Sequence, residues 1–247
     1  MTRTRTVLFG VLTVVAAAVC VRLGFWQLSR LEERRAKNTV MLARGAMPAV
    51  SVSALRSQDT TETHWRKATL RGVADYAHEA VYATRSQAGS PGVYLLTPVR
   101  PIDAAWGDTA VLLLRGYVYA ADGRTIDHDK AREDDTLSLD GLVTSFTVSK
   151  PGTVRLPSNA RAVKTLDRDT LSAITGAPLA PFVLLALGDT VVHDVTRPAR
   201  VPPPAITNGP HLSYALQWFG FATTFLVGYG FFVLGAGRKP KGRSDDV

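Results

Sequence analysis

The chain has 247 residues, which is enough for one ordinary domain with anchors and too few for two large domains. Its one cysteine, Cys20, excludes an intramolecular disulfide and the paired-cysteine sites of copper and zinc carriers. The formal net charge is +8, but the basic residues gather beside the two most apolar stretches, which favours membrane lipid over nucleic acid as a partner.

The first apolar stretch is residues 7–28, VLFGVLTVVAAAVCVRLGFWQL. Its length predicts a transmembrane helix in which Arg22 reaches the headgroups and Trp26 lies at the membrane interface. A cleaved signal peptide is the alternative, because the alanines at 16–18 resemble a cleavage site. The apolar character continues past them to Trp26, which favours an uncleaved anchor. The charged residues 30–44 are expected to extend the same helix.

From about residue 64 the sequence changes to short runs of β-branched and aromatic residues separated by Gly and Pro. These runs predict strands at residues 67–76, 80–84, 93–99, 110–119, 137–148, 182–187 and 190–195. A turn is expected at Gly188-Asp189. Apolar residues at helical spacing predict one helix at 166–174, beginning near Asp167 and closed by Gly176. The middle of the chain is therefore predicted to be a mostly antiparallel β domain with a short helix, arranged as a small barrel or sandwich.

The second apolar stretch, residues 212–234, contains no charged residue and has the length of a membrane span. Gly220, Gly228 and Gly230 are expected to let this helix approach another closely. The fold class is therefore an α+β membrane protein with two transmembrane helices flanking the β domain. The predicted order is a cytoplasmic arm at 1–6, a first span at 7–28, an exoplasmic β-rich domain with connecting segments at 29–210, a second span at 211–235 and a basic cytoplasmic tail at 236–247.

The charges near the spans indicate orientation. Two spans place both termini on one side, and the basic tail favours the cytoplasmic side. The segment after the first span is basic as well, which weakens this argument. The N-terminal arm is too short for a mitochondrial presequence, so we expect a bacterial plasma membrane.

His211 is the main candidate for chemistry, because it begins the second span and shares a helix face with Tyr214, Ala215 and Trp218. An imidazole at a membrane boundary beside aromatic rings suits ligation of the iron of a flat, apolar macrocycle. Trp218 would pack against the ring and Tyr214 would offer a hydroxyl group. The alternative is an interfacial histidine among belt aromatics. His128, between two aspartates, is expected in a solvated turn.

Trp26 and Arg30 lie one helical turn apart at the corresponding end of the first span. Arg30 could pair with an acidic side chain, a lipid phosphate or a haem propionate. The alternative is a plain headgroup anchor. The sequence contains no hydrolase, P-loop or dinucleotide motif, so no enzyme is predicted.

Four segments resemble those of a known family. Residues 24–30, GFWQLSR, are similar to G-x-W-Q-x-x-R, and residues 211–219, HLSYALQWF, are similar to H-x-x-Y-A-x-x-W-F. Between them, Thr97-Pro98 resembles a T-P pair, and residues 114–117, LRGY, resemble an R-G-W segment with Tyr in place of Trp. These are signatures of the SURF1 family, in the same order and at similar spacing.

The resemblance implies an assembly factor for haem-copper cytochrome c oxidase, and bacterial members are associated with binding haem a and delivering it to the large oxidase subunit. The histidine of the family corresponds to His211 and its tryptophan to Trp218. We therefore expect both helices to hold haem a at the exoplasmic interface, with His211 on the iron, Trp218 and Tyr214 nearby, and Trp26 with Arg30 closing the other side. The β domain would dock the large oxidase subunit or haem a synthase.

Three other functions stay open on the sequence. A scaffold would stabilise oxidase assembly intermediates without binding haem. A membrane-bound enzyme would act on haem or quinone, although no second catalytic group stands out. A ligand-sensing module would need an output domain, and the short basic tail offers none.

Overall fold

The computed structural model of the chain describes residues 3–149, 154–188 and 198–236. The chain divides into two compact units, which we describe separately. The helix unit comprises Met1–Val40 and Ile206–Val247, and the barrel unit comprises Met41–Ala205.

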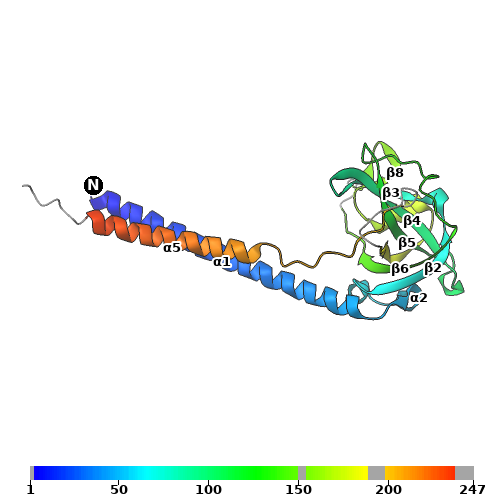
Figure 1. The fold of residues 1–247 in the computed structure, drawn as a ribbon, viewed down its shortest axis with the longest axis horizontal. Coiled ribbons are helices and arrows are strands. Elements are labelled where there is room, and N and C mark those ends of the chain that lie inside the picture. Colours follow the sequence, from blue (N-terminus) through cyan, green and yellow to red (C-terminus); the bar gives the residue numbers. More distant parts are fainter. Residues whose placement is uncertain (1–2, 150–153, 189–197, 237–247) are drawn as a thin grey trace, which may run out of the picture. The chain divides into compact units, whose positions relative to one another are not determined.

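Two long helices dominate the helix unit. They are α1 (Arg3–Ala46), which continues into the barrel unit, and α5 (His211–Ala236) (Figure 1). Both are long and apolar enough to cross a membrane. The expectation that charged residues 30–44 extend the first helix is confirmed, because α1 continues unbroken to Ala46.

The barrel unit contains strands with short helices between them. In chain order they are β1 (Val50–Ser51), α2 (Val52–Leu55), α3 (Thr60–Thr63), β2 (Lys67–Ala74), η1 (Tyr76–His78), β3 (Ala80–Gln87), β4 (Ser90–Pro101), η2 (Ala104–Trp106), β5 (Ala110–Tyr119), β6 (Thr136–Ser145), β7 (Arg155–Leu156), β8 (Asn159–Val163), α4 (Arg168–Thr175) and β9 (Leu179–Ala186).

The strands form one sheet in the order β1-β2-β6-β9-β5-β4-β3-β8-β7. An additional pairing of β2 with β4 closes β2, β6, β9, β5 and β4 into a barrel-like ring. In that closing pair Gly72 lies opposite Pro101, and a Cβ atom on Gly72 would lie 2.4 Å from the carbonyl oxygen of Arg100. The absence of a side chain at Gly72 therefore allows the sheet to close.

The sheet is mixed. Of its nine strand pairs among the described residues, six are antiparallel, as expected for a mostly antiparallel domain, and three are parallel, which the sequence did not predict. Within the described residues, β1–β2, β3–β8 and β5–β9 are parallel pairs. The β5–β9 pair forms part of the ring, and most residues of both strands are buried on both faces of the sheet. Their continuous apolar runs are typical of parallel strands buried on two sides. The apolar pattern of the sequence indicates that these strands are buried, but it does not indicate whether they run parallel or antiparallel.

Two apolar clusters flank β5. Val111 and Leu113 pack into one cluster, and Leu112 and Leu114 pack into the other. Successive side chains of a strand point to opposite faces, so this one strand contributes to both clusters. The core of the barrel unit is therefore formed by apolar side chains on both faces of β5.

The longer predicted strands are confirmed as β2, β3, β4, β5, β6 and β9, with ends that differ by a few residues. The predicted helix is confirmed as α4, where the Asp167 side chain accepts from the Thr170 backbone N–H and Gly176 ends the helix at φ 66°. The two-residue strands β1 and β7 and the strand β8 were not predicted. The predicted strand at 190–195 and the turn reaching residue 189 lie outside the described residues.

Candidate functional site

The helix unit brings the two sequence signatures together. α1 and α5 run antiparallel, since Gln27 contacts His211 at one end and the carbonyl oxygen of Thr6 accepts a hydrogen bond from Tyr229 at the other. The inward-facing positions of α1 alternate in steps of three and four residues. They are Gly10, Thr13, Ala17, Cys20, Gly24, Gln27 and Leu31. We call this row the seam, and its period of about 3.5 residues is that of a coiled coil.

Small residues of α1 allow the close approach. A Cβ atom on Gly24 would lie 2.5 Å from the ring of Phe219, and one on Gly10 would overlap the ring of Tyr229. The predicted role of Gly220, Gly228 and Gly230 is wrong, because a Cβ atom on any of them would meet nothing within 4 Å. The contact glycines are therefore on α1.

His211 is half-buried at the first position of α5, and its imidazole is fixed against α1. Its Nδ1 lies 2.9 Å from Oε1 of Gln27 on the seam. The other ring nitrogen borders Gly209, where an added Cβ atom would lie 3.5 Å from Nε2. Gly209 has a φ of 66°, a conformation that favours glycine. Gln27 thus holds Nδ1 in place, and the glycine at position 209 leaves Nε2 without a neighbouring side chain from that residue.

Polar side chains of α1 hold the segment that leads into α5. Arg34 Nε donates to the Thr207 carbonyl oxygen at 3.2 Å, and Asn38 Nδ2 donates to the same oxygen at 3.1 Å. Asn38 also donates to Oδ1 of Asn208 at 3.2 Å. Both side chains continue the seam spacing beyond Leu31. They fix the backbone only a few residues before His211.

The other predicted site residues on α5 do not take part in the contact between Gln27 and His211. Trp218 packs against Ala17, Cys20 and Ala222 between the helices, two helical turns along α5 from His211. Tyr214 is 47% exposed on the outer side of α5. The structure therefore joins His211 directly to Gln27, and leaves Trp218 and Tyr214 at separate positions on the helix surface.

Trp26 and Arg30 face away from the seam. Trp26 is 54% exposed and lines an open hollow of about 750 Å³. That hollow is lined by α1 residues, namely Ala18, Val21, Arg22, Leu23, Phe25 and Trp26. Arg30 pairs with Glu33 at 2.6 Å, one turn further along α1, so an acidic side chain is its partner in this structure.

Gln27, Arg34 and Asn38 were missed by the sequence reasoning as site residues. The 3.5-residue spacing of Gly10, Thr13, Ala17, Cys20 and Gly24 continues through all three positions and could have revealed them. The spacing is hard to recognise at this end of the seam because Gln27, Arg34 and Asn38 are polar, and a search for apolar periodicity passes over polar residues.

A second group of charged residues is buried in the barrel unit. Arg115, fully buried, pairs with Glu79 at 2.7 Å and with Glu133 at 3.1 Å. Arg200 pairs with Glu133 at 2.6 Å and donates to the carbonyl oxygen of Arg115 at 2.8 Å. We call these four residues the ionic cluster. Its two positive and two negative side chains balance, and it ties the segment before α5 to β5.

Glu79 accepts two further hydrogen bonds. Thr97 Oγ1 donates to one carboxylate oxygen, and His128 Nδ1 lies 2.9 Å from the other. Thr97 and Arg115 belong to the segments that resemble family motifs, and both contact Glu79. His128 lies in a turn, as predicted, but its side chain is only 29% exposed and its ring contacts this buried carboxylate, which corrects the expectation of a solvated setting. The sequence could not indicate this contact, since Glu79 lies 49 residues away in the chain.

The Glu79 carboxylate is expected to make the barrel unit acid-sensitive. Burial raises its pKa, but the hydrogen bonds from His128, Thr97 and Arg115 and the charge of Arg115 outweigh burial, so the pKa lies below its usual value. Because the folded pKa is below the unfolded one, the stabilisation is complete above the unfolded pKa. It is lost as pH falls through the folded pKa.

For Glu79→Gln we therefore expect a loss of about 1.5–3 kcal/mol at pH 7, in the range of hydrogen bonds to charged groups. The difference from wild type should shrink as pH falls below the usual carboxyl range. Thermal unfolding of the full chain in detergent, followed by circular dichroism from pH 7 to pH 3, measures it. A difference that stays constant across this range would contradict the assignment.

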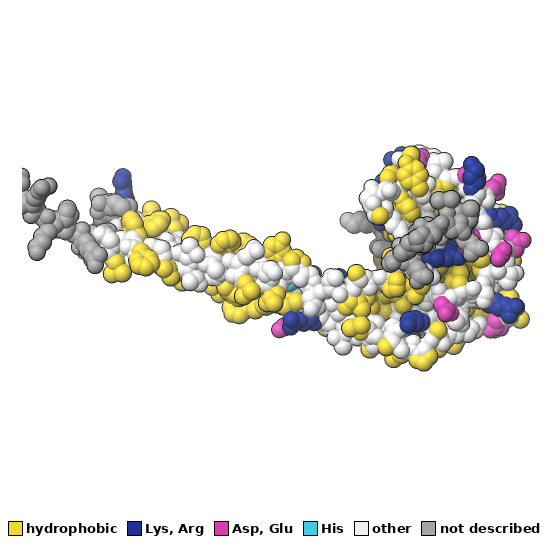
Figure 2. Space-filling model, viewed as in Figure 1, with side chains coloured by type: hydrophobic (Ala, Val, Ile, Leu, Met, Phe, Trp, Pro, Cys, Tyr) yellow, Lys and Arg dark blue, Asp and Glu magenta, His cyan; other side chains and the backbone are white. Residues whose placement is uncertain are grey.

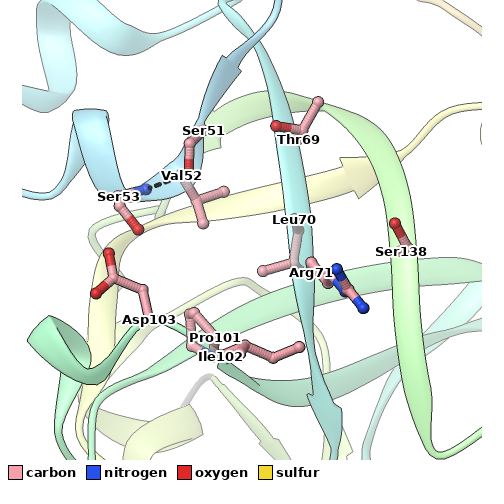
Figure 3. A pocket seen from close by; sticks show the side chains of 10 residues that line it. All are labelled: Ser51, Val52, Ser53, Thr69, Leu70, Arg71, Pro101, Ile102, Asp103 and Ser138. Carbon is pink, nitrogen blue, oxygen red and sulfur yellow. Dashed lines mark hydrogen bonds between the residues drawn. The ribbon is translucent and has the colours of Figure 1, made fainter.

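The barrel unit also has a smaller hollow of about 300 Å³. Ser51, Val52, Ser53, Thr69, Leu70, Arg71, Pro101, Ile102, Asp103 and Ser138 line it (Figure 3). Its polar groups serve local structure, since Ser51 caps α2, Asp103 caps η2 and points toward Ser53, and Trp106 donates to Ser53 at 3.0 Å. Across the part of the chain that the structure describes, no three His, Cys, Asp or Glu residues gather as a metal site. This hollow is therefore a weaker candidate site than the contact between Gln27 and His211.

Comparison with known proteins shows which family the chain belongs to. The model of the SURF1 family matches residues 14–223, which include Gln27, Arg115 and His211. A SURF1-like protein of Rickettsia conorii is 28% identical over 223 residues, covering 88% of each chain. A SURF1-like protein of Rickettsia felis is 28% identical over 225 residues, covering 89% of this chain and 94% of the relative. Because the family match extends over most of its length, the chain belongs to the SURF1 family.

Proposed function

We propose that the chain is a membrane-anchored assembly factor for haem-copper cytochrome c oxidase that binds haem a through His211. The SURF1 family is associated with cytochrome c oxidase assembly, and the match covers both signature segments. In this role the chain binds and releases its ligand and catalyses no reaction. Its partners would be the large oxidase subunit and haem a synthase, docked on the barrel unit.

The surface of the helix unit supports a membrane location. Outside the seam, large apolar side chains remain exposed on both helices (Figure 2). Examples are Leu8 at 60%, Leu216 at 64% and Phe231 at 72%. A water-exposed helix pair would leave this surface uncovered, whereas lipid chains cover it. We propose a bacterial plasma membrane with both termini in the cytoplasm and the barrel unit on the outer side. His211 would then lie near the outer interface.

The single observation that carries the haem proposal is the fixed imidazole of His211. The Nδ1 atom is held by Gln27, and the edge bearing Nε2 borders a glycine rather than a side chain. Haem a supplies an iron atom whose axial position accepts an imidazole nitrogen. The residues therefore fit the group: His211 would hold the iron through Nε2, and exposed Tyr214 and Trp26 would contact the apolar ring from the two helices.

One non-covalent ligand suits an assembly factor that must release its cargo. A covalently attached haem would need a C-x-x-C-H motif, which a chain with one cysteine does not contain. His211 lies at the end of a helix, where its backbone is fixed by neighbouring hydrogen bonds rather than by deep burial. This position would keep the imidazole oriented and still accessible from outside the helix pair.

Purification from cells that make haem a tests the proposal. The wild-type protein in detergent should show a haem a absorption spectrum, and His211→Ala should lose at least nine-tenths of it. His78→Ala is the matched control, because His78 is an exposed histidine paired with Asp75 at the surface. Haem content in His211→Ala equal to wild type would refute the ligand role. Oxidase subunits co-purifying with a haem-free wild type would select the scaffold function instead.

A further inference from the structure

We infer that Gln27 is a positioning residue that makes Nε2 of His211 the iron-binding atom and strengthens its bond to the metal. This inference rests on the proposed haem-binding function and deepens it. It concerns a residue of α1 that would not touch the haem iron itself and would act only through the imidazole.

The hydrogen bond fixes the tautomer of His211. Oε1 of Gln27 is a carbonyl oxygen and can only accept, so the proton of the neutral imidazole must lie on Nδ1, 2.9 Å away. The lone pair then lies on Nε2, at the ring edge beside Gly209. Without Gln27, the tautomer with its proton on Nε2 would compete, and that tautomer offers no lone pair in the same direction.

The surroundings make Gln27 the residue that sets the ring orientation. Within residues 3–149, 154–188 and 198–236, Gln27 is the one hydrogen-bond partner of the His211 ring. Its own place is set by the seam between Gly24 and Leu31, both buried. Contacts from Arg34 and Asn38 hold residues 207 and 208, which fixes the start of α5 at the same level.

An acceptor on the far nitrogen also changes the strength of the ligand. A histidine that donates its other N–H to a carbonyl or carboxylate is a more basic metal ligand, and loss of such a partner typically costs 10–100-fold in affinity. A carboxylate accepts more strongly than an amide oxygen. The identity of residue 27 should therefore tune the iron–histidine bond in two directions.

The experiment uses the full-length protein, purified with haem a from cells that make it, and compares Gln27→Met with Gln27→Glu. Transfer of haem to apomyoglobin measures retention, resonance Raman spectroscopy measures the iron–histidine stretching band of the reduced protein, and redox titration measures the reduction potential. Gln217→Met is the matched control, because Gln217 is an exposed glutamine of α5.

Gln27→Met should release haem about 10–100-fold faster than wild type and shift the iron–histidine band to lower frequency. Gln27→Glu should retain haem, shift the band to higher frequency and make the potential more negative. Gln217→Met should leave all three measurements unchanged. If Gln27→Met does not assemble, the opposite shift expected for Gln27→Glu still decides the matter.

The outcomes separate this inference from the function on which it rests. If His211→Ala loses haem while both Gln27 variants keep the wild-type band and retention, the positioning role is wrong and the ligand role stands. If wild type contains no haem, or His211→Ala keeps it, both are wrong. A change in haem release without any change in band or potential would indicate a purely structural role for Gln27 and would also overturn the inference.

Discussion

Replacing Arg115 by Met is expected to lower the free energy of unfolding of the barrel unit by about 3–5 kcal/mol. Arg115 is fully buried and is the partner of both Glu79 and Glu133. Removing its guanidinium leaves the buried Glu79 carboxylate without its arginine counterion. Chemical unfolding of the full chain, followed by the fluorescence of Trp65 and Trp106, the two tryptophans of the barrel unit, measures the loss.

Arg100→Met is the matched control. Arg100 is an exposed strand arginine that lies 3.7 Å from Asp75, and such surface pairs contribute about 0–1 kcal/mol. The double variant Arg115→Met with Glu79→Gln should recover part of the loss, because it removes the uncompensated charge. Equal stabilities of Arg115→Met and Arg100→Met would show that the ionic cluster does not hold the barrel unit together.

Replacing Gly24 by Leu is expected to separate α1 from α5 at the level of Gln27. The new Cβ atom would lie 2.5 Å from the Phe219 ring, which already packs edge-on with Phe25. Overpacking of this kind costs about 1–3 kcal/mol or more, which corresponds to roughly tenfold or greater loss of helix association. The hydrogen bond from His211 to Gln27 should be lost with it.

Cross-linking measures this separation. Cys20 packs beside Ala222, so in an Ala222→Cys background the rate of disulfide formation to Cys20 reports helix pairing. Gly24→Leu should reduce that rate about tenfold and reduce haem content in parallel. Gly220→Leu is the matched control and should change neither, because a Cβ atom there meets nothing within 4 Å. Similar effects of the two substitutions would contradict the arrangement of the seam.

The site was only partly predictable. His211 was identified because a histidine at the start of an uncharged apolar stretch is conspicuous, and its role as an iron ligand stays a prediction. Its partner Gln27 is visible in the sequence only as part of a motif, since no local pattern in α1 shows that residues 27 and 211 meet. Glycines were expected at the contact on α5 and were found on α1. A glycine in an apolar helix indicates possible close approach but not the face that makes it.

The sequence by itself determined the long apolar helices, the longer strands and the caps of α4, because these depend on local composition and on periodicities of 2 and 3.6 residues. The tertiary structure alone decided the parallel pairing of β5 with β9, the closure of β2 on β4 and the partners of Glu79 and His211. Those contacts join residues distant in the chain. These contacts are stabilised by burial and by the pairing of polar groups in the folded state. Local sequence patterns do not indicate which distant residues will pair.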